Sequence, residues 1–173
     1  MVDKDNRTYN YTVFETVAGW AAIAGRDGKV SALELPQATR EEAVARLGAG
    51  IGGQLVESNG EYETLARQLR DYLAGLKTEF TFEPDLAGLT DFQQAVLRTA
   101  MTVPYGVVVT YSWIASHAGR PGASRAAGQA LGRNPVPIAI PCHRVMASGG
   151  GLGGFSSGLR WKERLLKMEG VKL

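Results

Sequence analysis

The chain has 173 residues, enough for one large domain or two small ones with an apolar core. Apolar residues make up 45% and charged residues 21%, which is typical of a soluble globular protein, and no apolar run reaches the roughly 18 residues of a membrane span. One cysteine and two histidines exclude an internal disulfide and most zinc sites, and the polar start over residues 1–10 predicts no signal peptide, so we expect a reduced, intracellular, metal-free protein.

Charge is divided unevenly along the chain. Residues 1–90 carry nine Lys/Arg against fourteen Asp/Glu, giving −5, whereas residues 91–173 carry ten against three, giving +7. A basic half is typical of a protein that binds a polyanion, but a solvated basic surface gives the same count. Charge alone leaves both interpretations open.

The first third of the chain predicts a three-stranded antiparallel sheet. Runs over 9–17, 20–24 and 30–35 are rich in β-branched and aromatic residues or alternate in polarity. Asp27-Gly28 between the last two runs is a hairpin signal. A meander is the simplest arrangement of three such strands.

Two helices and a fourth strand are expected next. Thr39, followed by two glutamates, predicts a helix that runs to about Leu47 and ends in the glycine-rich loop 48–53. Residues 61–73 place their apolar side chains on one helical face, and residues 78–82 alternate as a short strand does. The aperiodic stretch that follows, where the charge changes sign, predicts a boundary between a domain over 1–85 and one over 86–173.

From Thr90 the chain predicts helices. Thr90 and Thr110 are suited to cap two of them, and residues 123–131 form another, made almost entirely of small residues. Two short helices joined by a tight glycine-containing turn are the outline of a helix-turn-helix, although many helical hairpins share it. The smooth last helix can approach a partner's backbone while Arg125 projects from it.

A glycine-rich loop over 147–158 and a final helix over 159–169 close the chain. The loop lacks the Gly-Lys-Ser/Thr sequence of a phosphate cradle, so we expect it to close over a pocket. The helix is amphipathic and basic. The side chains expected to face inward are Trp161, Leu165, Leu166 and Met168.

Cys142 and His143 are adjacent, between the apolar run 136–140 and that loop. A free thiol has a pKa of about 8.5, so it needs activation to be a nucleophile at neutral pH. His143 could accept its proton, directly or through a water, and a carboxylate such as Glu169 could orient the imidazole. A lone cysteine is more often a buried apolar residue and a lone histidine a satisfied core residue, so adjacency leaves both interpretations open.

The run Asn-Pro-Val-Pro-Ile-Ala-Ile-Pro-Cys-His-Arg-Val over residues 134–145 resembles the active-site signature of the O(6)-alkylguanine–DNA alkyltransferases, also called methylated-DNA–protein-cysteine methyltransferases. Three further segments keep the family's order and spacing: Pro104-Tyr105-Gly106…Thr110-Tyr111, Ser124-Arg125-Ala126-Ala127-Gly128 and Gly154-Phe155-Ser156…Glu169-Gly170. The resemblance covers roughly residues 90–170. The first half fits only as the family's variable domain.

The resemblance implies a fold of the α+β class. Residues 1–85 would form a supporting domain, ribonuclease H-like, with the three-stranded antiparallel sheet and helices. Residues 86–173 would form the mostly helical DNA-binding and alkyl-acceptor domain, with the helix-turn-helix.

The implied activity is direct-reversal DNA repair. Cys142 would take an alkyl group from guanine O6, or from thymine O4, in a flipped-out nucleotide and keep it irreversibly as a thioether. No cofactor is implied, because the guanine leaving group already activates the alkyl carbon. The implied partner is double-stranded DNA containing O(6)-alkylguanine, met by a monomer in the cytoplasm that is nucleoid-associated when bound.

Residue roles follow from the same resemblance. His143 would be a water-mediated base with Glu169 behind it, and Asn134 would hold the active-site turn. Tyr111 would rotate the nucleotide out and donate to guanine N3, and Arg125 would fill the space left in the base stack. The carbonyls of Cys142 and Val145 would accept from the guanine amine and the Ser156 N–H would contact O6. The remaining implied DNA and pocket contacts are Ser124, Gly128, Arg133, Phe155 and Ser157.

Phe155 and Ser157 stand where many members carry tyrosine and glycine, so they bear on the size of alkyl group accepted. Three other functions are compatible with parts of this sequence. A binding-only relative would have replaced Cys142, and a papain-type Cys-His hydrolase would turn over repeatedly. A helix-turn-helix regulator would need more side chains on its second helix to read base edges.

Overall fold

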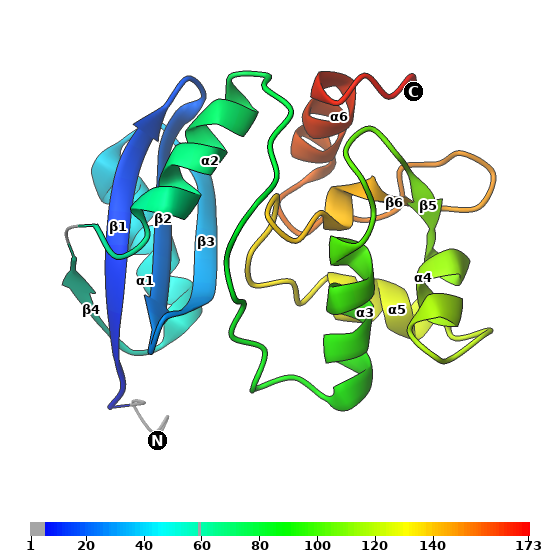
Figure 1. Cartoon of the computed structure of the whole chain (residues 1–173), viewed down its shortest axis with the longest axis horizontal. Coiled ribbons are helices and arrows are strands. Elements are labelled where there is room, and N and C mark those ends of the chain that lie inside the picture. Colours follow the sequence, from blue (N-terminus) through cyan, green and yellow to red (C-terminus); the bar gives the residue numbers. More distant parts are fainter. Residues whose placement is uncertain (1–5, 59) are drawn as a thin grey trace. The chain divides into compact units, whose positions relative to one another are not determined.

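The computed structural model describes residues 6–58 and 60–173. This part of the chain divides into two compact units, one ending at Asp85 and the other running from Leu86 to Leu173. Figure 1 shows a sheet with helices in the first unit and mainly helices in the second, so the fold is of the α+β class. Among the described residues, no helix is long and apolar enough to cross a membrane.

The predicted antiparallel meander is present in the first unit. Strands β1 (Thr8–Thr16), β2 (Gly19–Arg26) and β3 (Lys29–Gln37) pair in sequence. Asp27 and Gly28 join the last two with positive φ angles of 54° and 74°, the backbone that a two-residue hairpin turn requires.

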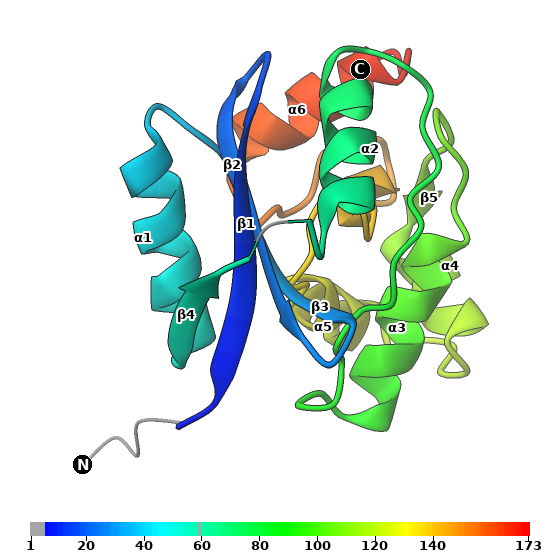
Figure 2. The same ribbon diagram turned by 60° about the vertical axis from the view of Figure 1, so that its left-hand side comes forward.

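Helices α1 (Arg40–Ile51) and α2 (Glu63–Leu73) lie on opposite faces of this sheet (Figure 2). One layer of the core, between the sheet and α1, contains Tyr9, Ala22, Ala24, Ala43 and Leu47. The continuous burial of β2 from Ala21 to Gly25 follows, because both of its faces are covered.

The prediction that the sheet has three strands is wrong. A fourth strand, β4 (Gln54–Glu57), pairs in parallel with β1, and the order is β3-β2-β1-β4. The predicted loop 48–53 is also largely helical, because α1 continues to Ile51 before Gly52 ends it. Only Leu55 of β4 is partly buried, so the strand carries no alternating pattern that sequence reasoning could detect.

The predicted strand over residues 78–82 is absent from the structure, which is irregular there. The Thr81 N–H donates to the side chain of Gln68 in α2 at 2.9 Å, and the Phe80 ring packs on Tyr72 with centroids 5.5 Å apart. The segment is therefore held by the side chains of a helix, although its alternating pattern resembles that of a strand.

The second unit is built from four helices: α3 (Asp91–Met101), α4 (Tyr111–His117), α5 (Ser124–Leu131) and α6 (Leu159–Met168). Both predicted caps are confirmed. Thr90 and Gln93 form a reciprocal capping box on α3, and the Thr110 hydroxyl accepts from the Trp113 N–H on α4.

Two short strands that the sequence did not predict join α4 to the Cys142 segment. Strand β5 (Val109–Thr110) leads directly into α4, and β6 (Val145–Met146) follows the 3₁₀ turn η1 (Cys142–Arg144). The strands pair in parallel, Val109 with Val145 and Thr110 with Met146. This pairing fixes the start of α4 beside the end of η1.

The inward face of α6 differs from the predicted one. Lys162, Leu165, Leu166 and Glu169 are buried, whereas Trp161 and Met168 are only half-buried. The buried four follow the i, i+3, i+4, i+7 spacing of a helical stripe, which includes two charged residues.

The hairpin turn provides a stability test in the first unit. A methyl group at Gly28 or at Gly50 would meet open space, but only Gly28 has a positive φ. Gly28→Ala should destabilise by about 1 kcal/mol, because L residues are disfavoured in this backbone region, whereas Gly50→Ala, inside α1, should stabilise by up to about 1 kcal/mol. Urea unfolding measures both, and equal effects of the two variants would contradict the turn assignment.

Candidate active site

Asn134, just beyond α5, organises the turn that carries the thiol. Its Nδ2 donates to the Ile140 carbonyl at 2.8 Å and to Cys142 Sγ at 3.0 Å, and its Oδ1 accepts from the Val136 N–H at 2.9 Å. Ile138 inside this turn has a φ of +72°, which is uncommon for a β-branched residue. One buried amide therefore holds both ends of the turn and contacts the sulfur.

The thiol of Cys142 is nearly buried, with 5% of the residue exposed. Burial raises its pKa above the ordinary value, while the hydrogen bond from Asn134 and the charge of Lys162 oppose that rise. The thiol is therefore neutral at rest, and a nucleophilic reaction requires its proton to be removed.

His143 and Glu169 form a fully buried pair behind the turn. His143 Nε2 lies 2.8 Å from Glu169 Oε1, so the carboxylate accepts from the ring and fixes its orientation. Burial lowers the pKa of His143, and the hydrogen bond and charge of Glu169 oppose the shift. The imidazole is neutral at neutral pH and is suited to accept a proton.

Arg144 compensates the buried charge of Glu169. Its Nε lies 2.9 Å from Glu169 Oε2, its Nη2 lies 3.0 Å from Oε1, and its Nη1 donates to the Val103 carbonyl at 2.6 Å. The Gly106 N–H also donates to Glu169 at 2.9 Å. The carboxylate thus ties η1, the end of α6 and the turn before β5 together, and the Arg144 guanidinium compensates its charge.

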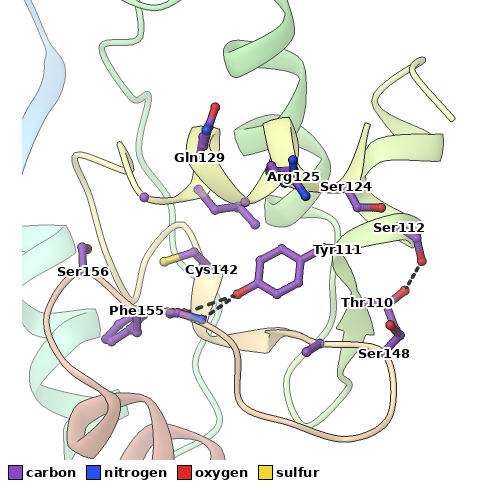
Figure 3. Close-up of a pocket in the computed structure, with 15 residues that line it drawn as sticks. Thr110, Tyr111, Ser112, Ser124, Arg125, Gln129, Cys142, Ser148, Phe155 and Ser156 are labelled. Atoms are coloured by element: carbon purple, nitrogen blue, oxygen red, sulfur yellow. Dashed lines mark hydrogen bonds between the residues drawn. The ribbon is translucent and has the colours of Figure 1, made fainter. Parts of the chain in front are cut away.

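Cys142 lies in a pocket of about 870 Å³ formed by the start of α4, by α5 and by the loop before α6. Figure 3 shows Cys142 between Tyr111 and the Phe155–Ser156 part of the loop, with Arg125 and Gln129 on α5 above them. A pocket of this size can hold a planar base with a substituent beside the sulfur.

The structure brings most of the predicted residues together. The pocket is lined by six of the nine predicted binding residues: Tyr111, Ser124, Arg125, Gly128, Phe155 and Ser156. Val145, Arg133 and Ser157 lie outside its lining; Val145 is buried behind it and the other two are exposed. Among the described residues, no group of three or more His, Cys, Asp or Glu side chains could hold a metal ion.

The Tyr111 hydroxyl is engaged by the loop. It accepts from the Gly154 N–H at 3.1 Å and lies 3.4 Å from the Gly154 carbonyl, as the dashed lines in Figure 3 mark. A methyl group on Gly153, whose φ is +71°, would overlap the hydroxyl. Glycine is therefore required for the loop to approach the ring this closely.

Several residues of the site were missed from the sequence, and Gln129 and Lys162 are the two with long polar side chains. Gln129 lines the pocket from the same face of α5 as Arg125, four residues away. Lys162 is fully buried, and its Nζ donates to the Val145 carbonyl at 2.5 Å and to the Gly154 carbonyl at 3.1 Å. Lys162 is spaced from Leu165, Leu166 and Glu169 as residues on one helical face are, and this spacing could have indicated that it is buried.

The chain resembles known proteins over nearly its whole length. Residues 91–171 match the family model described as "6-O-methylguanine DNA methyltransferase, DNA binding domain". The methylated-DNA–protein-cysteine methyltransferase of Mycobacterium bovis is 36% identical over 160 residues, which is 92% of each chain, and that of Mycobacterium leprae is 47% identical over 111 residues, 64% of this chain and 67% of that one.

Solved structures agree with this match. The crystal structure of Mycobacterium tuberculosis OGT in complex with DNA shares 35% identity with a TM-score of 0.75, covering 94% of this chain and 92% of that one. The O6-methylguanine-DNA methyltransferase of Pyrococcus kodakaraensis shares 28% identity with a TM-score of 0.69, covering 94% and 99%.

The Glu169 cluster provides a test of buried charge with a control on the same helix. Glu169→Gln leaves the Arg144 guanidinium without its anion and should destabilise by about 3–5 kcal/mol. Glu163→Gln breaks only the exposed pair with Lys167 and should cost at most about 1 kcal/mol. Urea unfolding at pH 7 compares them, and similar losses would show that the buried carboxylate is not the centre of the cluster.

Proposed function

The chain belongs to the methylated-DNA–protein-cysteine methyltransferase family, and from this premise we propose how its own residues carry out the reaction. The protein repairs DNA by direct reversal, moving an alkyl group from guanine O6 to a cysteine. Cys142 is its only cysteine and is therefore the acceptor. The observation that carries the proposal is this thiol in the Tyr111–Arg125 pocket, with His143 and Glu169 behind it.

In the proposed reaction, His143 removes the thiol proton through a water and Glu169 stabilises the imidazolium that forms. The sulfur attacks the alkyl carbon, so the S–C bond forms as the C–O6 bond breaks. The electron pair of the broken bond stays on guanine, which takes up one proton from water, and the His143 imidazolium returns the thiol proton to water. The thioether is not cleaved, so each chain reacts once. The guanine leaving group activates the carbon, and the step draws on no cofactor.

The target carbon lies inside the duplex, so the nucleotide must first be extruded, which costs a few kcal/mol. Arg125, exposed on a helix of small residues, is suited to enter the duplex and fill the gap. Tyr111 at the start of α4 would press on the target's phosphate, and its hydroxyl would exchange its bond to Gly154 for one to guanine N3.

Within the pocket, the carbonyls of Cys142 and Val145 would accept from the guanine amine and the Ser156 N–H would contact O6. Asn134 would hold the turn that aims these groups. Thymine O4 presents a similar alkyl ether and is proposed as a second substrate. Phe155 lines the pocket and Ser157 borders it, so both would limit the alkyl group that fits.

We propose that α4 and α5 act as a helix-turn-helix, with α5 toward DNA. The +7 charge of residues 91–173 would attract DNA of any sequence. Ser124, Gly128 and Arg133 would contact the DNA backbone. The unit up to Asp85 would serve as a ribonuclease H-like supporting domain. The unit from Leu86 would bind DNA and contain the cysteine that accepts the alkyl group. One thiol completes the reaction, so the protein would act as a monomer and without a metal. Its substrate would be O(6)-alkylguanine in double-stranded DNA, so we propose that it works in the cytoplasm, at the nucleoid.

Intact mass spectrometry tests the acceptor. Incubation with a duplex containing O(6)-methylguanine should add one methyl group, about 14 Da, to each chain, located on Cys142. Cys142→Ala should gain nothing while binding the same duplex. More than one transfer per chain, or an adduct on the variant, would refute the proposal.

The role of Arg125 is separable from simple charge. Arg125→Ala should slow repair in duplex DNA by at least about 10-fold, because no side chain then fills the gap that the extruded base leaves. The same variant should slow repair in a single-stranded oligonucleotide by less than about 2-fold, because no base has to leave a duplex. Arg164→Ala, which removes an exposed charge from α6, is the control. Equal slowing on both substrates would assign Arg125 to phosphate attraction alone.

A further inference from the structure

Lys162 is a charged group in an unusual place. The residue is fully buried, and its ammonium donates to two backbone carbonyls, of Val145 and Gly154. Among the described residues, no carboxylate lies within ion-pair distance of it. Burying an ammonium without an anion destabilises a fold, so stability does not explain its presence.

The two carbonyls belong to two separate segments beside the pocket. Val145 directly follows the η1 turn that carries Cys142, and Gly154 belongs to the loop that engages the Tyr111 hydroxyl. The ammonium also lies over the Tyr111 ring, 5.8 Å from its centroid. Lys162 thus connects the thiol segment, the loop and the start of α4 at one point.

The charge of Lys162 also acts on the reacting sulfur. Of the titratable groups, Cys142 and His143 of η1 and Tyr111 of α4 face it. The Lys162 charge opposes the rise that burial causes in the pKa of Cys142, and it adds to the lowering of the pKa of His143. Burial lowers the pKa of Lys162 itself to about 8. During alkyl transfer, negative charge moves from sulfur to guanine O6 inside this pocket, where a fixed cation stabilises it more than water would.

We infer that Lys162 is a positioning residue for alkyl transfer: its ammonium pins the segment that carries Cys142 to the Gly154 loop and places a positive charge near the reacting sulfur. The inference rests on the proposed function. If the buried charge serves the reaction, the fold should be no less stable without it.

The test compares Lys162→Met, Lys162→Arg and the exposed control Lys167→Met in the full chain. Methionine fills a similar volume without charge, so Lys162→Met should raise the melting temperature or leave it unchanged at pH 7. The folded-state pKa of Lys162 lies below its ordinary value, so wild-type stability should rise with pH above about 8, and that rise should be absent from Lys162→Met.

The ionisation of the Cys142 thiol is measured without DNA, as the pH midpoint of its alkylation by iodoacetamide. Intact mass spectrometry follows the alkylation. Lys162→Met should move this midpoint to higher pH and slow methyl transfer from O(6)-methylguanine DNA by at least about 10-fold. Lys162→Arg, which keeps the charge, should stay near the wild-type midpoint, and Lys167→Met should match wild type in both assays.

A lower melting temperature for Lys162→Met with an unchanged midpoint would make Lys162 a structural residue and overturn the inference. If Lys162→Met does not fold, the midpoint in Lys162→Gln decides in the same way. A wild type that reacts with iodoacetamide but gains no methyl group would refute the proposed function, while the midpoint would still test Lys162.

Discussion

The second unit depends on one buried carboxylate. Glu169 follows the last turn of α6, yet it accepts hydrogen bonds from His143 and Arg144 in η1 and from Gly106 in the turn before β5. An isolated carboxylate at this depth would be expelled or protonated, and the guanidinium of Arg144 prevents both. Packing of the final helix and placement of the carboxylate beside His143 therefore occur together.

Much of the site could be predicted because its signals are local. The adjacent Cys142 and His143 stand in a short, specific sequence, and Thr90 and Thr110 are caps that act within three residues of themselves. The Asp27-Gly28 hairpin likewise depends only on the backbone preferences of its two residues. Each is determined by neighbours in the chain.

The features that escaped prediction depend on distant partners. Strand β4 exists because β1 offers an edge, and β5 and β6 are two residues long and pair across the unit. The segment 78–82 has the alternation of a strand but finds Gln68 as its partner. Lys162 was overlooked because a lysine on an amphipathic helix is normally solvated, and only the packing of η1 and the loop against α6 buries it.

The neutral, buried state of the Cys142 thiol has a consequence for a protein that works once. Peroxide and disulfides attack exposed thiolates, so a sulfur that is shielded and protonated between encounters resists sulfenic acid formation and glutathione capping. Its reaction at neutral pH requires that the proton first be removed inside the pocket. The same burial that makes the nucleophile weak at rest preserves each molecule for the single lesion it can repair.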